Sequence, residues 1–338
     1  MTVNSMHGFW HEARLASTRM VFSALCLTVL AAGCTPAPNP EIRIGTNIWP
    51  GYEPLYLARS LGWLKDSGIR LIEFTSSTET MNSLRHGSIE AGALTLDEVL
   101  TLAQDGVNLR VVLVLDVSNG ADAVVAQPDI AGVKGLRGRT IGTESTAVGG
   151  YMVDRMLEKS GLSLSDIHIL PLMLDEHEAA FTARQVDAVV TFEPVKSHLL
   201  ARGGKVIFDS SLIPGEIIDV LAVRSESLKR APKSFAYLAD SWYRALDYMR
   251  RQPDDAALRM RPRLNLTPDQ LLLQYTGLNL GNRQLNQSFF GDTDNPPAKR
   301  AANLTRIMRK NGLLHHDVDV SQLFIAEPIH PAARGDLP

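Results

Sequence analysis

The chain has 338 residues, of which 45% are apolar, and this is enough for a large buried core and about two domains. Its 34 basic and 37 acidic residues give a net charge of -3, so no basic field is available to hold a nucleic-acid backbone. Composition therefore argues against a disordered chain and against nucleic-acid binding.

The first element is an apolar run at residues 20–32, which follows two arginines. It is shorter than the roughly 20 apolar residues of a membrane-spanning helix, and this favours a signal-peptide core. The run ends in LAAGC, residues 30–34, which resembles the lipobox of bacterial lipoproteins. We predict a lipoprotein signal peptide over residues 1–33 and lipidation of Cys34. A plain signal peptide cut at an Ala-x-Ala-like site is the alternative.

Cysteine usage agrees with this interpretation. Cys26 and Cys34 are the two cysteines of the chain, and Cys26 would leave with the signal peptide. The mature chain would then form no internal disulfide, even in an oxidising compartment. TPAPNP, residues 35–40, is typical of a polyproline-type tether, so we expect residues 34–40 to lift the domain off a membrane.

From Glu41 onward, short apolar runs alternate with amphipathic helical patterns, which predicts an α/β fold with mostly parallel sheets. Ser76 with Glu79, and Thr95 with Glu98, have the capping-box spacing that begins a helix. We expect strands at IRIGT (42–46), IRLIEFT (69–75), EAGALT (90–95) and RVVLVLDVS (110–118), and helices at 54–68, 76–87 and 95–106.

Two short motifs recur at one offset. IGT at 44–46 is repeated at 141–143, and IEA at 89–91 is matched by VDA at 186–188, in both cases 97 residues later. Chance similarity between buried strands is one explanation. The shared offset favours two similarly built lobes in tandem.

The second half of the chain is expected to return to the first lobe. An apolar strand at 220–223 could pair back onto that lobe, and the pattern is helical from Pro232. Leu238, Trp242, Leu246 and Met249 share one helix face, and Thr267 with Pro268 begins another helix. We therefore expect a first lobe over 41–127, a second lobe over 128–219, and a return strand and covering helices of the first lobe over 220–338. Two connections between lobes would form a hinge over a cleft.

Several spaced segments carry a family resemblance: IRIGTNIWPGYEPLYLARSLGWLKDSGIRL, TLDEVLTLAQDGVNLRVVLVLDVSNGADAVVA, GLRGRTIGTE, VDAVVTFEP and FDSSLIPGEIIDVL. Together they resemble solute-binding proteins of the nitrate, sulfonate, taurine and thiamine-pyrimidine group of ABC importers. The resemblance implies a type II periplasmic-binding-protein clamshell, with C-terminal helices packed on the first lobe and the ligand held between the lobes. It also implies an ABC permease and its ATPase as partners, an extracytoplasmic location and a monomer without a cofactor.

An aromatic pair follows the first strand. Trp49 and Tyr52 flank Pro-Gly, a turn that would reverse the chain and present both rings to the cleft. Asn47 is a neighbouring polar candidate. Packing of both rings on the core, and a turn role for Asn47, are the alternatives.

Hydroxyl groups at helix starts form a second set of candidates. Their neighbouring backbone amides would suit an anion such as nitrate, a sulfonate or a carboxylate. Helix capping alone is the alternative, most directly for the serines and Thr95. The set consists of Ser76, Ser77, Thr78 and Thr95 in the first lobe and Ser145 and Thr146 in the second.

Carboxylates form the third set, and the best-placed loops contain no Lys or Arg. Several carboxylates would repel an inorganic anion, so a zwitterion, a cation or a neutral hydrogen-bonding aromatic compound fits better. The resemblance implies an amine contact for Glu193, whereas helix capping and solvent exposure are the alternatives for all of these acids. The candidates are Asp97, Asp122, Glu193 and Asp219, with Asn119 beside Asp122 as a polar contact.

These observations favour a lipid-anchored solute-binding protein that delivers a sulfonate, an amino compound or a pyrimidine precursor to an ABC importer. A ligand-sensing receptor for a membrane signalling protein is one alternative. An enzyme acting on a pyrimidine precursor is another, but no cysteine follows Cys34 and no recognised nucleophile or metal motif occurs. We predict no enzymatic activity and no metal site.

Overall fold

The computed structural model describes residues 41–65, 67–144 and 148–325. The predicted signal peptide, Cys34 and tether, and also Ser145 and Thr146, lie outside the described residues.

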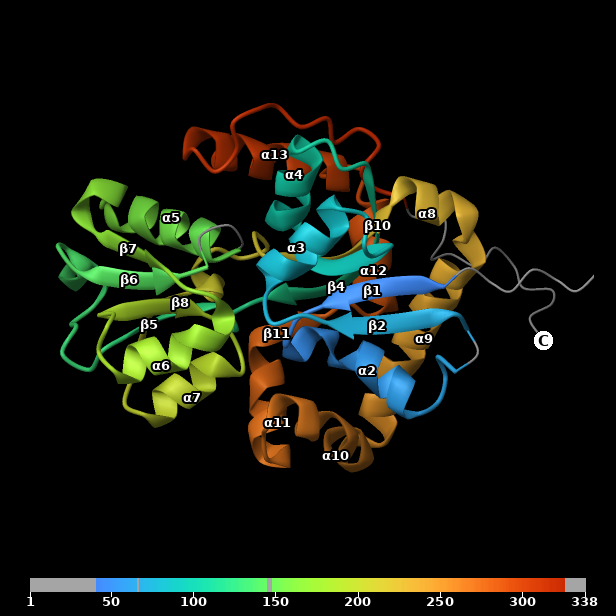
Figure 1. The fold of residues 1–338 in the computed structure, drawn as a ribbon, viewed down its shortest axis with the longest axis horizontal. Helices are drawn as coiled ribbons and strands as arrows, with labels where there is room; N and C mark the ends of the chain where they lie inside the picture. Colours follow the sequence, from blue (N-terminus) through green and yellow to red (C-terminus); the bar gives the residue numbers. More distant parts are fainter. Residues whose placement is uncertain (1–40, 66, 145–147, 326–338) are drawn as a thin grey trace, which may run out of the picture. The chain divides into compact units, whose positions relative to one another are not determined.

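Two mixed β-sheets organise the fold, one in each lobe (Figure 1). The first sheet has the order β11-β4-β10-β3-β1-β2, and the second has the order β7-β6-β8-β5-β9. The strands of the first sheet are β1 (Ile42–Thr46), β2 (Ile69–Glu73), β3 (Ala91–Thr95), β4 (Leu109–Ser118), β10 (Ile218–Arg224) and β11 (Leu278–Leu280). Those of the second are β5 (Ala123–Ala126), β6 (Thr140–Thr143), β7 (His168–Pro171), β8 (Ala188–Thr191) and β9 (Lys205–Asp209). The four strands expected before residue 118 are confirmed, with small differences at their ends.

The sequence repeat is confirmed in the strand register. In the first sheet β1 pairs in parallel with β3, with Ile44 opposite Ala91. In the second sheet β6 pairs in parallel with β8, with Ile141 opposite Ala188, which is the same pair of positions 97 residues later. In each sheet an antiparallel strand lies beside this parallel set, β10 beside β3 and β5 beside β8, and the first sheet has a second antiparallel strand, β11 beside β4. The two lobes are thus built on one plan.

Helices cover both faces of each sheet. Figure 1 shows α5 on one face of the second sheet and α6 and α7 on the other. The helices that follow strands of the first lobe are α2 (Glu53–Ser60), α3 (Ser77–Arg85) and α4 (Leu96–Gln104), and those of the second are α5 (Val148–Ser160), α6 (His177–Thr182) and α7 (Val195–Ala201). The remaining helices are α8 (Ser225–Arg230), α9 (Pro232–Arg251), α10 (Pro253–Leu264), α11 (Pro268–Gln274), α12 (Arg283–Gly291) and α13 (Pro297–Lys310).

The first crossing between the lobes lies earlier than expected. Strand β5 pairs with β8 and β9, so residues 123–126 belong to the second sheet. The crossing therefore occupies residues 119–122, and the expected boundary at 127 is wrong by one short strand. The chain returns at β10, which begins at Ile218, close to the expected position. The sequence pattern misplaced β5 because a short apolar strand has the same pattern in whichever sheet it lies.

Helix α2 is shorter than expected. It ends at Ser60 because Gly62 adopts a left-handed backbone with φ of +78°, which closes the helix with a bond from Gly62 N to the carbonyl oxygen of Arg59 (3.0 Å). The expected end at Gly68 is therefore wrong.

The C-terminal helices pack mainly on the first lobe, as expected. Helix α9 lies against α2 and α10, α12 lies against β4, and α13 lies against α4. On α9, Leu238 and Trp242 are fully buried, and Trp242 Nε1 donates to the carbonyl oxygen of Gly281 (2.9 Å). The three-residue strand β11 was not expected, because it is too short to show alternation. Among the described residues, none of the helices combines the length and the apolar character needed to cross a membrane.

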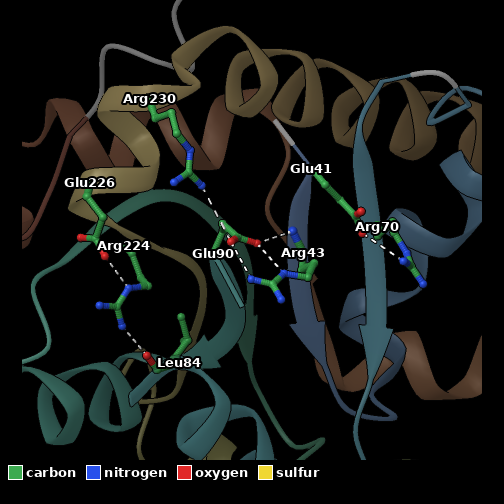
Figure 2. A network of polar contacts seen from close by, with 8 residues as sticks. All are labelled: Glu41, Arg43, Arg70, Leu84, Glu90, Arg224, Glu226 and Arg230. Atoms are coloured by element: carbon green, nitrogen blue, oxygen red, sulfur yellow. Dashed lines mark hydrogen bonds and ion pairs between the residues drawn. The ribbon is translucent and has the colours of Figure 1, made fainter. Parts of the chain in front are cut away.

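A polar network closes the edge of the first sheet where its parallel strands begin (Figure 2). Glu90 accepts bonds from the backbone N of Arg43 (2.8 Å), from its Nε (3.0 Å) and from its Nη2 (2.9 Å). Arg224 donates through its Nε to Glu226 (2.6 Å). The network joins β1, the start of β3 and the end of β10, away from the strand ends that carry the candidate site.

We expect Glu90→Gln to lower the free energy of unfolding by about 2 kcal/mol, because it weakens several charge-assisted bonds to a largely buried acceptor. Urea denaturation measures this loss. Glu41→Gln removes the exposed pair with Arg70 and is the matched control, with no loss beyond experimental error. Equal losses in the two variants would contradict a special role for Glu90.

Candidate functional site

Three neighbouring strands of the first sheet place polar side chains in one row. Asp219, at the start of β10, lies opposite Thr95 of β3 on one side and opposite Asp116 of β4 on the other. Because β10 is antiparallel to both, its beginning meets their carboxyl ends. Ligands of open α/β sheets bind beyond such ends.

The WPGY segment passes directly over this row. Residues Pro50–Tyr52 form a 3-10 turn that leads into α2, instead of the chain reversal that the Pro-Gly pair predicted. A Cβ on Gly51 would lie 1.9 Å from Asp116 Oδ2 and 2.3 Å from Trp49 Nε1, so only glycine fits here. Trp49 Nε1 donates to Asp116 Oδ2 (3.0 Å), and the hydroxyl of Tyr52 donates to Asp219 Oδ1. The turn thus fixes both rings on the carboxylate row.

Both rings are buried and are not an exposed pair. Trp49 is 4% exposed and Tyr52 is 2% exposed, and both join the apolar core of the first lobe. Trp49 also meets Phe192 of the second lobe edge to face, with ring centroids 5.4 Å apart. Trp49 therefore packs on the core of its own lobe and also faces the other lobe, so both roles considered from the sequence apply to it.

A small cavity lies between the two lobes at this point. It offers about 10 Å³ to water-sized occupants, hardly enough for one water molecule. Its lining comes from strand ends and helix starts of both lobes: Asn47, Trp49, Tyr52, Ser77, Thr95, Asp122, Val148, Phe192 and Asp219. All but Val148 and Phe192 were candidates from sequence. The lobes are closed here, and a solute would require them to separate.

The start of helix α3 is occupied by a carboxylate of the protein itself. Glu144, which follows β6 in the second lobe, accepts bonds from the backbone N (2.8 Å) and the hydroxyl of Thr78. Ser76 caps the same helix by accepting from the backbone N of Glu79 (3.2 Å). The position that we expected to hold a ligand anion therefore joins the two lobes in this conformation.

We expect the Thr78 and Glu144 side chains to be energetically coupled. The measurement is a double-mutant cycle of Thr78→Val and Glu144→Gln by urea denaturation. A coupling energy of about 1–2 kcal/mol is expected, because a charge-assisted bond between the lobes is lost in either single variant. Additive losses would show that this contact does not hold the lobes together.

The other candidates are placed less directly. Glu193 has one carboxylate oxygen accepting from the backbone N of Ser197 (3.1 Å) and the other 3.3 Å from Lys196 Nζ, which matches the capping alternative. Asp97 is buried and lines a separate cavity with Thr78, and Asn119 is exposed on the crossing between lobes. None of these three lines the small cavity described above.

Burial dominates the electrostatics of the site. It raises the pKa of Asp116 to about 7, with a further increase from the neighbouring Asp122. It also raises the pKa of Asp122 to about 7, with further increases from Asp97 and Glu193. Burial also raises the pKa of Glu98 to about 8 and that of Asp97 to about 6. The pKa of Asp219 is raised well above its usual range by burial and then by Asp116. The site therefore takes up protons readily when it is closed.

Sequence reasoning missed several residues of this site. Asp116 is an acidic residue within an otherwise apolar strand, and that misfit was the available signal. Phe192 and Glu144 lie within the quoted segments VDAVVTFEP and GLRGRTIGTE, but nothing in their spacing shows which residues of the other lobe they would touch. Across the part of the chain that the structure describes, no cluster of His, Cys, Asp or Glu has the arrangement of a metal site.

Solved structures similar to this chain include binding proteins and an enzyme. The alkanesulfonate-binding protein of Xanthomonas axonopodis pv. citri bound to MOPS has a TM-score of 0.72 at 19% identity, covering 86% of this chain and 100% of that one. The nitrate-binding protein of Synechocystis has a TM-score of 0.67 at 13% identity, covering 85% and 87%. A desulfurization enzyme has a TM-score of 0.60 at 17% identity, covering 85% and 97%. At these identities the comparison establishes the shared two-lobe fold.

Comparison with curated protein sequences finds no match. A family model, by contrast, matches residues 35–260, which is more than half of the chain. The matched region includes both sheets except β11, and it contains every described residue that lines the small cavity. The chain therefore belongs to the NMT1-like family.

Proposed function

We propose that the protein is a solute-binding component of an ABC importer, which captures a small polar solute by closing its two lobes. The observation that carries this proposal is the cavity whose walls come from the strand ends of both lobes. The fold shared with sulfonate- and nitrate-binding proteins supports the same function. Its partners would be the permease and ATPase of the importer.

The anchor belongs to the same proposal. We infer an extracytoplasmic monomer held at a bacterial membrane by a lipid on Cys34, on the basis of the LAAGC motif. Globomycin, which blocks lipoprotein signal peptidase, should make the uncleaved precursor accumulate. Normal processing in its presence would contradict the lipid anchor.

We propose binding without catalysis. A desulfurization enzyme shares the fold, so the fold does not decide this point. The described residues that line the cavity include no Cys, His or Lys, and none of its Ser or Thr hydroxyls has a histidine beside it in that lining. Nucleophilic catalysis by a Ser or Thr hydroxyl needs an adjacent base such as histidine. The residues instead suit hydrogen bonding and enclosure of a solute.

A thermal-shift screen tests the function. Sulfonates, nitrate, amines, quaternary ammonium compounds and thiamine precursors are supplied to the purified protein, because a ligand at ~100 times its Kd adds about 2.7 kcal/mol to apparent stability. Small-angle X-ray scattering then compares the radius of gyration of the free and the ligand-bound protein, which should differ because a solute can enter the cavity only if the lobes move. A panel without any hit would contradict the proposed function. A hit that leaves the radius of gyration of the ligand-free protein unchanged would contradict it as well.

A further inference from the structure

The small cavity is acidic and has no counter-charge in its described lining. Asp122 and Asp219 line it, one at the start of β5 and one at the start of β10. Asp116 is linked to the same wall through Trp49. Of the described lining residues, none is Lys or Arg.

Two buried oxygens of this cluster have no hydrogen-bond partner in the described part of the chain. They are Oδ2 of Asp122, on a residue 4% exposed, and Oδ1 of Asp116, on a residue that is fully buried. Lys196 acts on Asp122, but its Nζ donates to the carbonyl oxygen of Gly120 (2.9 Å) and pairs with Glu193 (3.3 Å). A buried carboxylate without a partner is costly, and a cation is the partner that it lacks.

Aromatic rings form the rest of the wall. Trp49 and Phe192 stand at an interplanar angle of 88°, and Tyr52 lines the same cavity. The faces of aromatic rings carry negative charge density and attract ammonium groups, most strongly when water is excluded. Rings around a carboxylate therefore suit an organic cation better than a sulfonate.

The expected anion position gives independent support. At the start of α3, the amide and hydroxyl of Thr78 already bind the carboxylate of Glu144. This helix start has a positive dipole end, which would otherwise attract an anionic ligand group. With that position filled by the second lobe, the unpartnered buried side-chain oxygens of the described cavity lining are Oδ2 of Asp122 and the hydroxyl of Thr95, and only the first carries charge.

We propose that this site binds a small organic cation, with an ammonium group held by Asp122 and enclosed by Trp49, Tyr52 and Phe192. The proposal rests on the proposed function, since it names the class of solute on which the lobes close. It separates this chain from the similar proteins whose names refer to alkanesulfonate and nitrate. Because the cavity of this closed arrangement offers only about 10 Å³, the cation would be enclosed with the lobes further apart than they are here.

Isothermal titration calorimetry at pH 8 with matched probes tests this assignment. Ethylamine and ethanesulfonate share an ethyl group and carry charged groups of opposite sign, taurine carries both groups, and choline presents a quaternary ammonium. We expect choline or ethylamine to bind at least tenfold more tightly than ethanesulfonate and nitrate. Asp122→Asn should weaken the bound cation at least tenfold, whereas Asp254→Asn, at an exposed site on α10, should leave its affinity unchanged.

Three results would overturn the cation assignment. Binding of ethanesulfonate or nitrate in preference to the cations would overturn the cation assignment and leave the proposed function intact. An unchanged cation affinity in folded Asp122→Asn protein, verified by circular dichroism, would also overturn it. Absence of binding by every probe would overturn the assignment, and absence of any hit in the wider thermal-shift panel would overturn the proposed function as well.

Discussion

Trp49→Ala is expected to lower the affinity for the bound solute by about 100-fold, or about 2.7 kcal/mol. The ring lines the cavity, donates to Asp116 and meets Phe192 of the other lobe. Truncation therefore removes both the wall facing the solute and a contact made when the lobes close. Buried aromatic residues at the centre of an interface cost about this much when truncated to alanine.

Calorimetry with the best hit of the solute screen measures this loss. Trp63→Ala is the matched control, because Trp63 packs against Tyr248 with ring centroids 6.1 Å apart and does not line the cavity. Its affinity should change less than about twofold, within the range of distant, independent sites. Equal affinities of the Trp49→Ala variant and the unmodified protein would contradict a role for Trp49 in solute binding.

The affinity for choline should fall about 100-fold between pH 8 and pH 5. Choline keeps its charge over this range, so the change reports the protein. The closed site raises the pKa of Asp122 to about 7, mainly by burial. Ionised Asp122 is needed to hold the cation, and below its pKa a proton must leave for each cation bound. One such carboxylate loses up to about tenfold in affinity per pH unit below pH 7.

Several groups face Asp122 and enter this titration. Asp97 on α4 and Glu193 beside α7 raise its pKa, and Lys196 on α7 lowers it. Asp116 and Asp219 complete the surrounding charges from β4 and β10, since Asp122 in turn raises the pKa of both. In Asp122→Asn protein the pH dependence should flatten markedly. A wild-type affinity that is constant over this range, or that rises towards pH 5, would contradict an ionised carboxylate at the cation.

Folding of the ligand-free protein should be coupled to proton uptake, so its free energy of unfolding should fall as the pH rises. The folded state raises the pKa values of these acids, so it binds protons more tightly than the unfolded chain. Their contribution to stability is fully present below the ordinary carboxyl pKa and is lost as pH rises through about 7. A bound cation should reverse part of this loss.

The sequence predicted the elements that depend on local pattern. Apolar runs identified β1, β3 and β4 nearly to the residue, and the shared offset of 97 anticipated the common register of the two sheets. The rule that ligands bind at strand ends brought together most of the cavity lining, including Trp49 and Asp219. Whether these residues bind a solute stays a prediction.

The contacts between lobes were not predictable in the same way. Glu144 and Thr78 are 66 residues apart, and their pairing depends on how two separately patterned lobes close. Phe192 was adjacent to a chosen acid, yet only the closed arrangement sets it against Trp49. The N-terminus of any predicted helix is a candidate anion site, because its first backbone amides are free. The hydrophobic periodicity of the sequence does not reveal which group will occupy that site.

A crystal structure of the protein with choline is the most direct test of the whole account. We expect choline to be enclosed between the lobes, which would lie further apart than in the ligand-free structure because the cavity there offers only about 10 Å³. We expect the ammonium nitrogen within ~4 Å of an Asp122 carboxylate oxygen, with aromatic faces of Trp49, Tyr52 and Phe192 around it. Choline bound outside the space between the lobes, or an anion at the start of α3 in place of Glu144, would contradict it.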